Sequence, residues 1–256
     1  MPFQKVEPEK LSRSVVHQIE ALILQGVLRP GERLPSEREL SDRLGVSRPS
    51  LREAVAELQE SGLLVSRAGS GIFVADVLGS AFSPALIRLF ATHDNAVFDY
   101  LSFRRDMESL AADRATRFGS KADLGLIDTI FRKMEAAHQK RNPEDEARLD
   151  AEFHMAILEA SHNVILLHMM RSMFDMLREG VFFNREVMFR HKATRDILLD
   201  QHRAINDAIQ SRDPAAARAA VEAHLTYVEE SLAAQRKADR NEEVARMRLE
   251  QEVNRG

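Results

Sequence analysis

The spacing of apolar residues is the feature that most constrains the fold of this chain. Along almost all of its 256 residues, apolar side chains recur three or four positions apart, which is the period of an α-helix with one buried face. The pattern changes to short strand-like runs at residues 64–67 and 72–75, on either side of a glycine-containing tip at 68–71. We therefore predict a mainly α-helical protein that contains one β-hairpin.

Three helical segments precede this hairpin. The first covers residues 11–25, and the second and third begin at the capping residues Ser36 and Ser47. Glu39, three positions after Ser36, completes the sequence pattern of a capping box. Helix, short helix, helix and hairpin is the element order of a winged helix-turn-helix. Residues 1–76 are therefore predicted to form a DNA-binding domain of this type.

The third segment carries two arginines that are suited to reading DNA. Arg48 and Arg52 are four positions apart and share one helix face, opposite the apolar Leu51 and Val55. The planar fork of arginine bonds bidentately to guanine or phosphate, and a recognition helix reads bases from its N-terminal part. The alternative is an ordinary solvated helix face. Net charge does not decide between them, because residues 1–76 contain 10 basic and 11 acidic side chains.

The stretch 11–75, which includes LPSERELSDRLGVSRPSLREAVAELQESGLL, resembles the DNA-binding domain of the GntR family of bacterial transcription regulators. The resemblance implies a homodimer that binds a palindromic operator in double-stranded DNA, since two-fold protein symmetry is mirrored in such a site. It also implies DNA contacts from the second and third helices and from the tip of the hairpin. The predicted DNA-binding residues are Arg38, Ser47, Arg48, Ser50, Arg52, Gly69 and Gly71.

The second part of the chain shows helical patterns alone. Residues 77–84 are predicted to be a linker, residues 85–234 an all-helical domain, and residues 235–256 a charged C-terminal tail that is either a frayed helix or disordered. Asn163 is expected to cap the C-terminus of the helix before it. There is no cysteine, which excludes disulfides and thiolate metal sites. Neither a signal peptide nor a membrane span is visible, so we expect a cytoplasmic protein without a membrane partner.

In the helical domain, polar residues occupy several positions at which the helical period of the sequence predicts apolar ones. His202 and His224 each lie in the inward row of a helix, and Asp150 and His154 share one face of a third helix, a single turn apart. Each histidine taken alone is more simply a hydrogen-bonded core residue. Together, three imidazoles and one carboxylate form a good ligand set for a divalent metal, with Zn²⁺ favoured and Ni²⁺ or Mn²⁺ as alternatives.

Arg104 also lies in an inward-facing row, and a buried arginine needs an anion. Two anions satisfy that requirement. One is Glu108, one helical turn further on. The other is the carboxylate of a small ligand that Arg104 and the metal hold together. The sequence leaves both alternatives open, and we assign Arg104 as the effector-binding residue of the second one.

Residues 85–234 resemble the ligand-sensing domain of the FadR-type branch of the GntR family, chiefly through AEFHMAILEASHN (151–163) and DQHRAINDAI (200–209). The branch pattern is matched by Arg104 with Glu108, by Asp150 with His154, and by the later single histidines 202 and 224. The resemblance implies a bundle of six or seven helices around a metal that has open positions for a small organic acid. The whole chain is similar to regulators that respond to lactate, glycolate or pyruvate.

The predicted function is therefore a transcription regulator, expected to be a repressor, whose operator affinity is controlled by a 2-hydroxy or 2-oxo monocarboxylate bound at the metal. The alternative is a metalloenzyme with an appended DNA-binding module. A hydrolytic metal site needs a general base near the bound water. The nearby Glu152 projects from a different side of its helix than Asp150, so we predict that the chain is not an enzyme.

Overall fold

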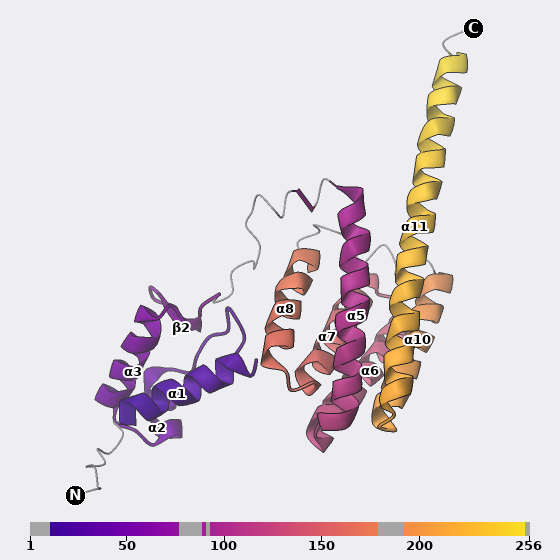
Figure 1. Cartoon of the computed structure of the whole chain (residues 1–256). Coiled ribbons are helices and arrows are strands. Elements are labelled where there is room, and N and C mark those ends of the chain that lie inside the picture. The colour runs from indigo at the N-terminus through magenta and orange to yellow at the C-terminus, as the bar shows by residue number, and fades with distance from the viewer. Residues whose placement is uncertain (1–10, 77–88, 91–92, 179–191, 254–256) are drawn as a thin grey trace, which may run out of the picture. The chain divides into compact units, whose positions relative to one another are not determined.

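The computed structural model describes residues 11–76, 89–90, 93–178 and 192–253 (Figure 1). The chain divides into two compact units, Met1–Ala81 and Phe82–Gly256, and each is described by itself. The predicted linker at 77–84 lies outside the described residues, as do residues 1–10 and most of the helix expected at 85–92. The domain boundaries at 76 and 85 therefore remain predictions.

The first unit is a winged helix-turn-helix, as the sequence predicts. Its helices are α1 (Leu11–Leu24), α2 (Glu37–Leu44) and α3 (Arg48–Glu60), and its antiparallel hairpin is formed by β1 (Leu64–Arg67) and β2 (Gly71–Val74). An isolated bridge joins Arg33 to Phe73, so the loop before α2 lies against the hairpin. The core is made by apolar side chains of α1, α3 and the strands, including Val15, Ile19, Leu51, Leu58 and Leu64.

The second unit is an α-helical bundle. Its described helices are α5 (Asp94–Phe118), α6 (Lys121–Lys140), α7 (Pro143–Ala160), α8 (Val164–Arg178), α10 (Lys192–Gln210) and α11 (Pro214–Val253). The first part of α11 packs along α5 and α10, while α7 packs against α5, α6 and α8 (Figure 1). One apolar core runs through all six helices, with Phe153, Leu158, Ile205 and Leu225 among its fully buried members. The predicted mainly α fold is confirmed.

Capping interactions set where the helices begin. The Ser36 hydroxyl accepts a hydrogen bond from the backbone N–H of Glu39 at 3.3 Å, which starts α2 as predicted. The carboxylate of Glu39, however, accepts from Arg43 at 2.6 Å instead of returning to the cap. A complete capping box occurs at the start of α6, between Ser120 and Asp123. At α2 the predicted box is therefore only half formed, because a cation one turn away attracts the carboxylate more strongly.

Two helix ends differ from the expectations. Asn163 caps the start of α8, where its side-chain oxygen accepts from the N–H of Leu166 at 3.1 Å. The predicted C-terminal cap of α7 is therefore wrong, and His162 instead takes the left-handed conformation after that helix, at φ 48°. At the other end of the chain, α11 continues to Val253 with exposed side chains such as Val244. Of the two states predicted for the tail, helix is the one present over residues 235–253.

Among the described helices, none combines the length and the apolar character that a membrane crossing requires.

Candidate DNA-binding surface and metal centre

The N-terminus of α3 presents the predicted reading residues to solvent. The Ser47 hydroxyl caps the helix by accepting from the N–H of Ser50 at 3.3 Å. Leu51 is fully buried on the inner face of α3, and this turns Arg48 and Arg52 outward, where both are exposed. Arg38, on α2, is exposed as well. The helical period thus produces the outward-facing arginines that the DNA-binding prediction needs.

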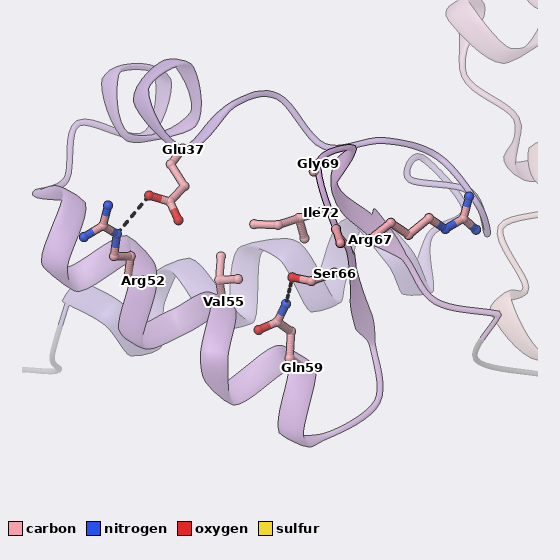
Figure 2. Close-up of a pocket in the computed structure, with 10 residues that line it drawn as sticks. Glu37, Arg52, Val55, Gln59, Ser66, Arg67, Gly69 and Ile72 are labelled. Carbon is pink, nitrogen blue, oxygen red and sulfur yellow. Dashed lines mark hydrogen bonds and ion pairs between the residues drawn. The ribbon is translucent and has the colours of Figure 1, made fainter.

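A groove of about 460 Å³ separates α3 from the hairpin (Figure 2). Its apolar floor includes Val55 and Ile72, while Arg52, Gly69 and Gly71 line it from the two sides. Three of the predicted DNA-binding residues therefore border one concave surface, to which α3 contributes one wall and the wing the other. Arg38, Ser47, Arg48 and Ser50 lie outside this lining and belong to the α2–α3 part of the predicted surface.

The two glycines of the wing differ in how strictly they are required. Gly69 has φ +70° and open space where a Cβ would lie, whereas Gly71 has φ +111°, and an added Cβ would lie 3.1 Å from Nε of Arg33. We expect Gly71→Ala to cost about 1–3 kcal/mol of local stability and Gly69→Ala about 1 kcal/mol. Thermal melting and DNA affinity of the two variants check this order, and equal losses would contradict it.

In the second unit, four predicted ligands from three helices meet in the core. Asp150 and His154 come from adjacent turns of α7, His202 from α10 and His224 from α11, and all four are buried. One potential ligand atom from each lies within 4.8 Å of all the others. The sequence placed each residue on an inward face, and the packing of α7, α10 and α11 brings these faces to one point.

Two neighbours fix the orientation of two of the imidazoles. Nδ1 of His154 lies 2.7 Å from Oε2 of Glu108, on α5. Nδ1 of His224 donates to the side-chain oxygen of Gln201 at 3.0 Å. Both contacts favour the tautomer with its hydrogen on Nδ1, which leaves Nε2 with a lone pair that faces the cluster. Metal-binding histidines generally have such partners on the other ring nitrogen.

Burial keeps these rings in the neutral form that binds metals. Desolvation lowers the pKa of His154, and the opposing attraction of Glu108 does not reverse the shift. For His224, burial and then the neighbouring His202 and His154 lower the pKa well below its ordinary value. Neutral imidazoles in this pocket are therefore available as ligands without first losing a proton.

The spacing of three of the ligand atoms fits a shared cation site. Nε2 of His202 lies 3.1 Å from Oδ1 of Asp150 and 3.3 Å from Nε2 of His154, and Oδ1 of Asp150 lies 3.7 Å from Nε2 of His154. Bonds of about 2.0–2.2 Å to a shared Zn²⁺ place neighbouring ligand atoms roughly 3.0–3.4 Å apart, whether the coordination is octahedral or tetrahedral. If Nε2 of His202 carries no hydrogen, acceptor atoms gathered this closely inside a core repel one another unless a cation lies among them.

The second ring nitrogen of His202 distinguishes this residue from the other two histidines. Among the residues that the structure describes, Nδ1 of His202 has no hydrogen-bond partner although it is buried. A histidine retained in a core for hydrogen bonding alone would be expected to use both of its ring nitrogens. Nε2 of His202, by contrast, faces two other ligand atoms. Hydrogen bonding alone therefore does not account for His202, although its Nδ1 also lacks the outer partner that His154 and His224 have.

Arg104 forms a buried ion pair with Glu108, whose Oε1 accepts from Nε of the guanidinium at 2.6 Å. Burial alone raises the pKa of Glu108, but the charge of Arg104 and the hydrogen bonds from His154 and Arg104 outweigh it and lower that pKa to about 2. The simpler of the two sequence alternatives is therefore present, because Glu108 is the anion that balances Arg104. A second carboxylate is not thereby excluded, since a guanidinium carries five N–H donors.

Sequence reasoning missed two contributions to this centre. It paired Glu108 with Arg104 but did not connect it to His154, which belongs to a different helix. It gave Gln201 no role, although that residue is adjacent to His202 in the chain and contacts His224 instead. The periodicity of α5 placed Glu108 on an inward face and was the available signal. Nothing in the local sequence marks Gln201.

Comparison with known proteins covers both units. Residues 11–74 match the profile of "Bacterial regulatory proteins, gntR family", and residues 99–227 match that of the "FCD domain". The chain is 37% identical over 227 residues to the "Putative L-lactate dehydrogenase operon regulatory protein" of Escherichia coli (strain K12), which covers 87% of this chain and 86% of the relative. It is 33% identical to the "Glc operon transcriptional activator" of the same strain, with coverages of 89% and 91%.

A solved structure described as "Streptococcus agalactiae GntR" has the same fold, with a TM-score of 0.51 at 24% identity over 86% of this chain and 99% of the other. The relatives carry the names of transcription regulators, so the metalloenzyme alternative is set aside. The chain belongs to the gntR family of bacterial regulatory proteins, with a C-terminal FCD domain, and it is a DNA-binding transcription regulator.

Proposed function

We propose that this regulator is controlled by a small monocarboxylate, which binds a divalent metal in the helical unit. Asp150, His154, His202 and His224 hold the metal, and Arg104 lies at the same site. The observation that carries the proposal is the convergence of four buried ligand atoms within 4.8 Å. Zn²⁺ suits this donor set best, with Ni²⁺ and Mn²⁺ as the alternatives.

The charge of the site favours a monoanion. The carboxylates of Glu108 and Asp150 oppose the single guanidinium of Arg104, and a histidine binds a metal as the neutral imidazole, which leaves one net negative charge among these groups. A divalent metal reverses this to one net positive charge. Because uncompensated charge inside a protein is costly, one carboxylate is the complement that restores neutrality.

Chemistry narrows the class of carboxylate further. A 2-hydroxy or 2-oxo acid presents two oxygens that close a five-membered ring on a metal, whereas a simple fatty acid presents its carboxylate alone. The metal supplies positive charge and open coordination positions, and Arg104 supplies further N–H donors. One relative is named for an L-lactate dehydrogenase operon, which supports L-lactate as the first candidate, followed by glycolate and pyruvate.

Control of transcription follows if the acid binds more tightly to one arrangement of a homodimer than to another. A coupling of about 1–3 kcal/mol changes operator affinity by roughly 5–150-fold. We propose a palindromic operator, as expected for a two-fold symmetric dimer. We predict that the protein represses its target genes. One relative is named as an activator, so the direction of control needs a test of its own. A reporter gene under the operator provides it.

The deciding experiment measures DNA affinity with and without the acids. The probe is a duplex selected by the purified protein from a randomised pool. We expect L-lactate, glycolate or pyruvate to change its affinity by at least about fivefold. The matched control is Asp150→Asn, which should bind the duplex but lose the response. Unchanged affinity with all three acids at saturation, in protein shown to contain metal, would reject this effector class.

A further inference from the structure

An ion pair at the rim of the groove between α3 and the hairpin is not explained by DNA binding alone (Figure 2). Oε2 of Glu37, from the first turn of α2, accepts a hydrogen bond from Nε of Arg52 at 2.9 Å. Both side chains remain substantially exposed, at 39% and 67%. A carboxylate thus lies on the predicted DNA-reading surface, where its charge opposes the approach of phosphates.

The atom that Glu37 binds determines what Arg52 can still do. Because the carboxylate accepts from Nε, this ion pair does not use the two terminal nitrogens of the guanidinium (Figure 2). Two parallel N–H groups are what a bidentate contact to guanine O6 and N7 requires. The ion pair therefore holds the guanidinium plane while leaving its reading edge open.

We propose that Glu37 is a positioning residue for sequence readout by Arg52. By holding the arginine in one orientation, it reduces the conformational freedom lost when a base edge is bound. By its charge, it weakens the attraction of the same arginine to phosphates at any sequence. Both effects increase the preference for the operator over other DNA. The proposal agrees with a DNA-binding unit whose basic and acidic residues nearly balance, 10 against 11 in residues 1–76.

The alternative is that Glu37 only stabilises its helix, and a second residue on the same helix, Glu39, serves as a matched control for that role. An acidic residue in the first turn stabilises a helix through its dipole, and Glu39 occupies that turn too. Glu39 is likewise exposed and pairs with an arginine, Arg43, at 2.6 Å. Arg43 is not among the predicted DNA-binding residues. E37Q and E39Q therefore remove the same charge and the same kind of contact, and they differ in which arginine is released.

The test measures binding of both variants to the duplex selected from a randomised pool and to a scrambled duplex of equal length. We expect E37Q to bind the scrambled duplex more tightly and the selected one no more tightly, so that its preference falls about tenfold. The slope of log affinity against log salt for the scrambled duplex should steepen by about one. E39Q should keep the preference of the wild type within about twofold.

A double-mutant cycle separates positioning from general charge effects. If Glu37 acts through Arg52, E37Q should leave the preference unchanged in an R52A background. Melting temperatures establish that each variant is folded. The proposal is overturned if E37Q and E39Q change the affinities for the selected and the scrambled duplex by the same factor. It is also overturned if E37Q alters the preference for the selected duplex as much in the R52A background as in the wild type.

Discussion

Removing the proposed metal with a chelator is expected to lower the melting temperature of the helical unit by about 10 °C. A ligand present at a thousand times its Kd adds about 4 kcal/mol to the stability of the form that binds it. Each kcal/mol moves the melting temperature of a unit of this size by about 2–4 °C. The physical source is the cluster itself, since without a cation the ligand atoms of Asp150, His154 and His202 face one another 3.1–3.7 Å apart in the core.

Scanning calorimetry before and after chelation measures the shift, and adding Zn²⁺ back should restore the original transition. His202→Ala is the informative variant, because it removes a central ligand and should make melting insensitive to the chelator. His162→Ala is its matched control. His162 is a surface histidine that pairs with Asp123 at 2.9 Å, and its loss should leave the chelator response intact. A chelator effect of equal size in the two variants would contradict the proposed ligands.

The order of elements could be predicted because its determinants are local. Helical period, capping serines and the change of pattern at the hairpin all act within a few residues. Where two local signals competed, the prediction was less accurate. Glu39 binds Arg43 instead of the helix cap, and Asn163 caps the helix after it instead of the one before it. In both cases two possible partners lie within a few residues, and the local sequence does not show which of the two is bound more strongly.

The composition of the candidate metal centre could be predicted only in part. Periodicity identifies which face of a helix is buried, so Asp150, His154, His202 and His224 were recognisable one helix at a time. That the four ligand atoms meet depends on how α7, α10 and α11 pack, which no local pattern reports. The contacts that orient the rings, from Glu108 and Gln201, also cross between helices.

The same limit applies to charged pairs elsewhere in the bundle. Nε2 of His138 on α6 lies 3.0 Å from Oδ1 of Asp196 on α10. Arg195, the neighbour of Asp196, forms a buried pair with Glu146. These residues link α6, α7 and α10 over separations of about fifty positions. Long-range ion pairs of this kind follow from tertiary packing and leave no periodic trace in the chain.

Replacing Glu108 by glutamine should destabilise the protein by about 3–5 kcal/mol, because it leaves Arg104 as a buried cation without its anion. It should also weaken metal binding by about 10–100-fold, since the charge beside Nδ1 of His154 is lost. The matched control is Glu229→Gln. Glu229 pairs at 2.7 Å with Arg105, the neighbour of Arg104, but that pair is nearly one-third exposed. The pair of Glu229 with Arg105 should contribute about 1 kcal/mol or less to the free energy of unfolding.

A third variant separates stability from metal binding. In the double variant R104M/E108L the ion pair is replaced by apolar side chains of similar volume, which often restores the stability that a half-broken pair loses. We expect it to unfold at a denaturant concentration near that of the wild type. Its zinc affinity, measured by competition with a coloured chelator, should stay as low as in E108Q. If E108Q is no less stable than E229Q, the buried pair does not contribute the expected stability. If zinc affinity returns in the double variant, Glu108 does not orient His154 for the metal. In that outcome the buried pair would serve the packing of α5 alone.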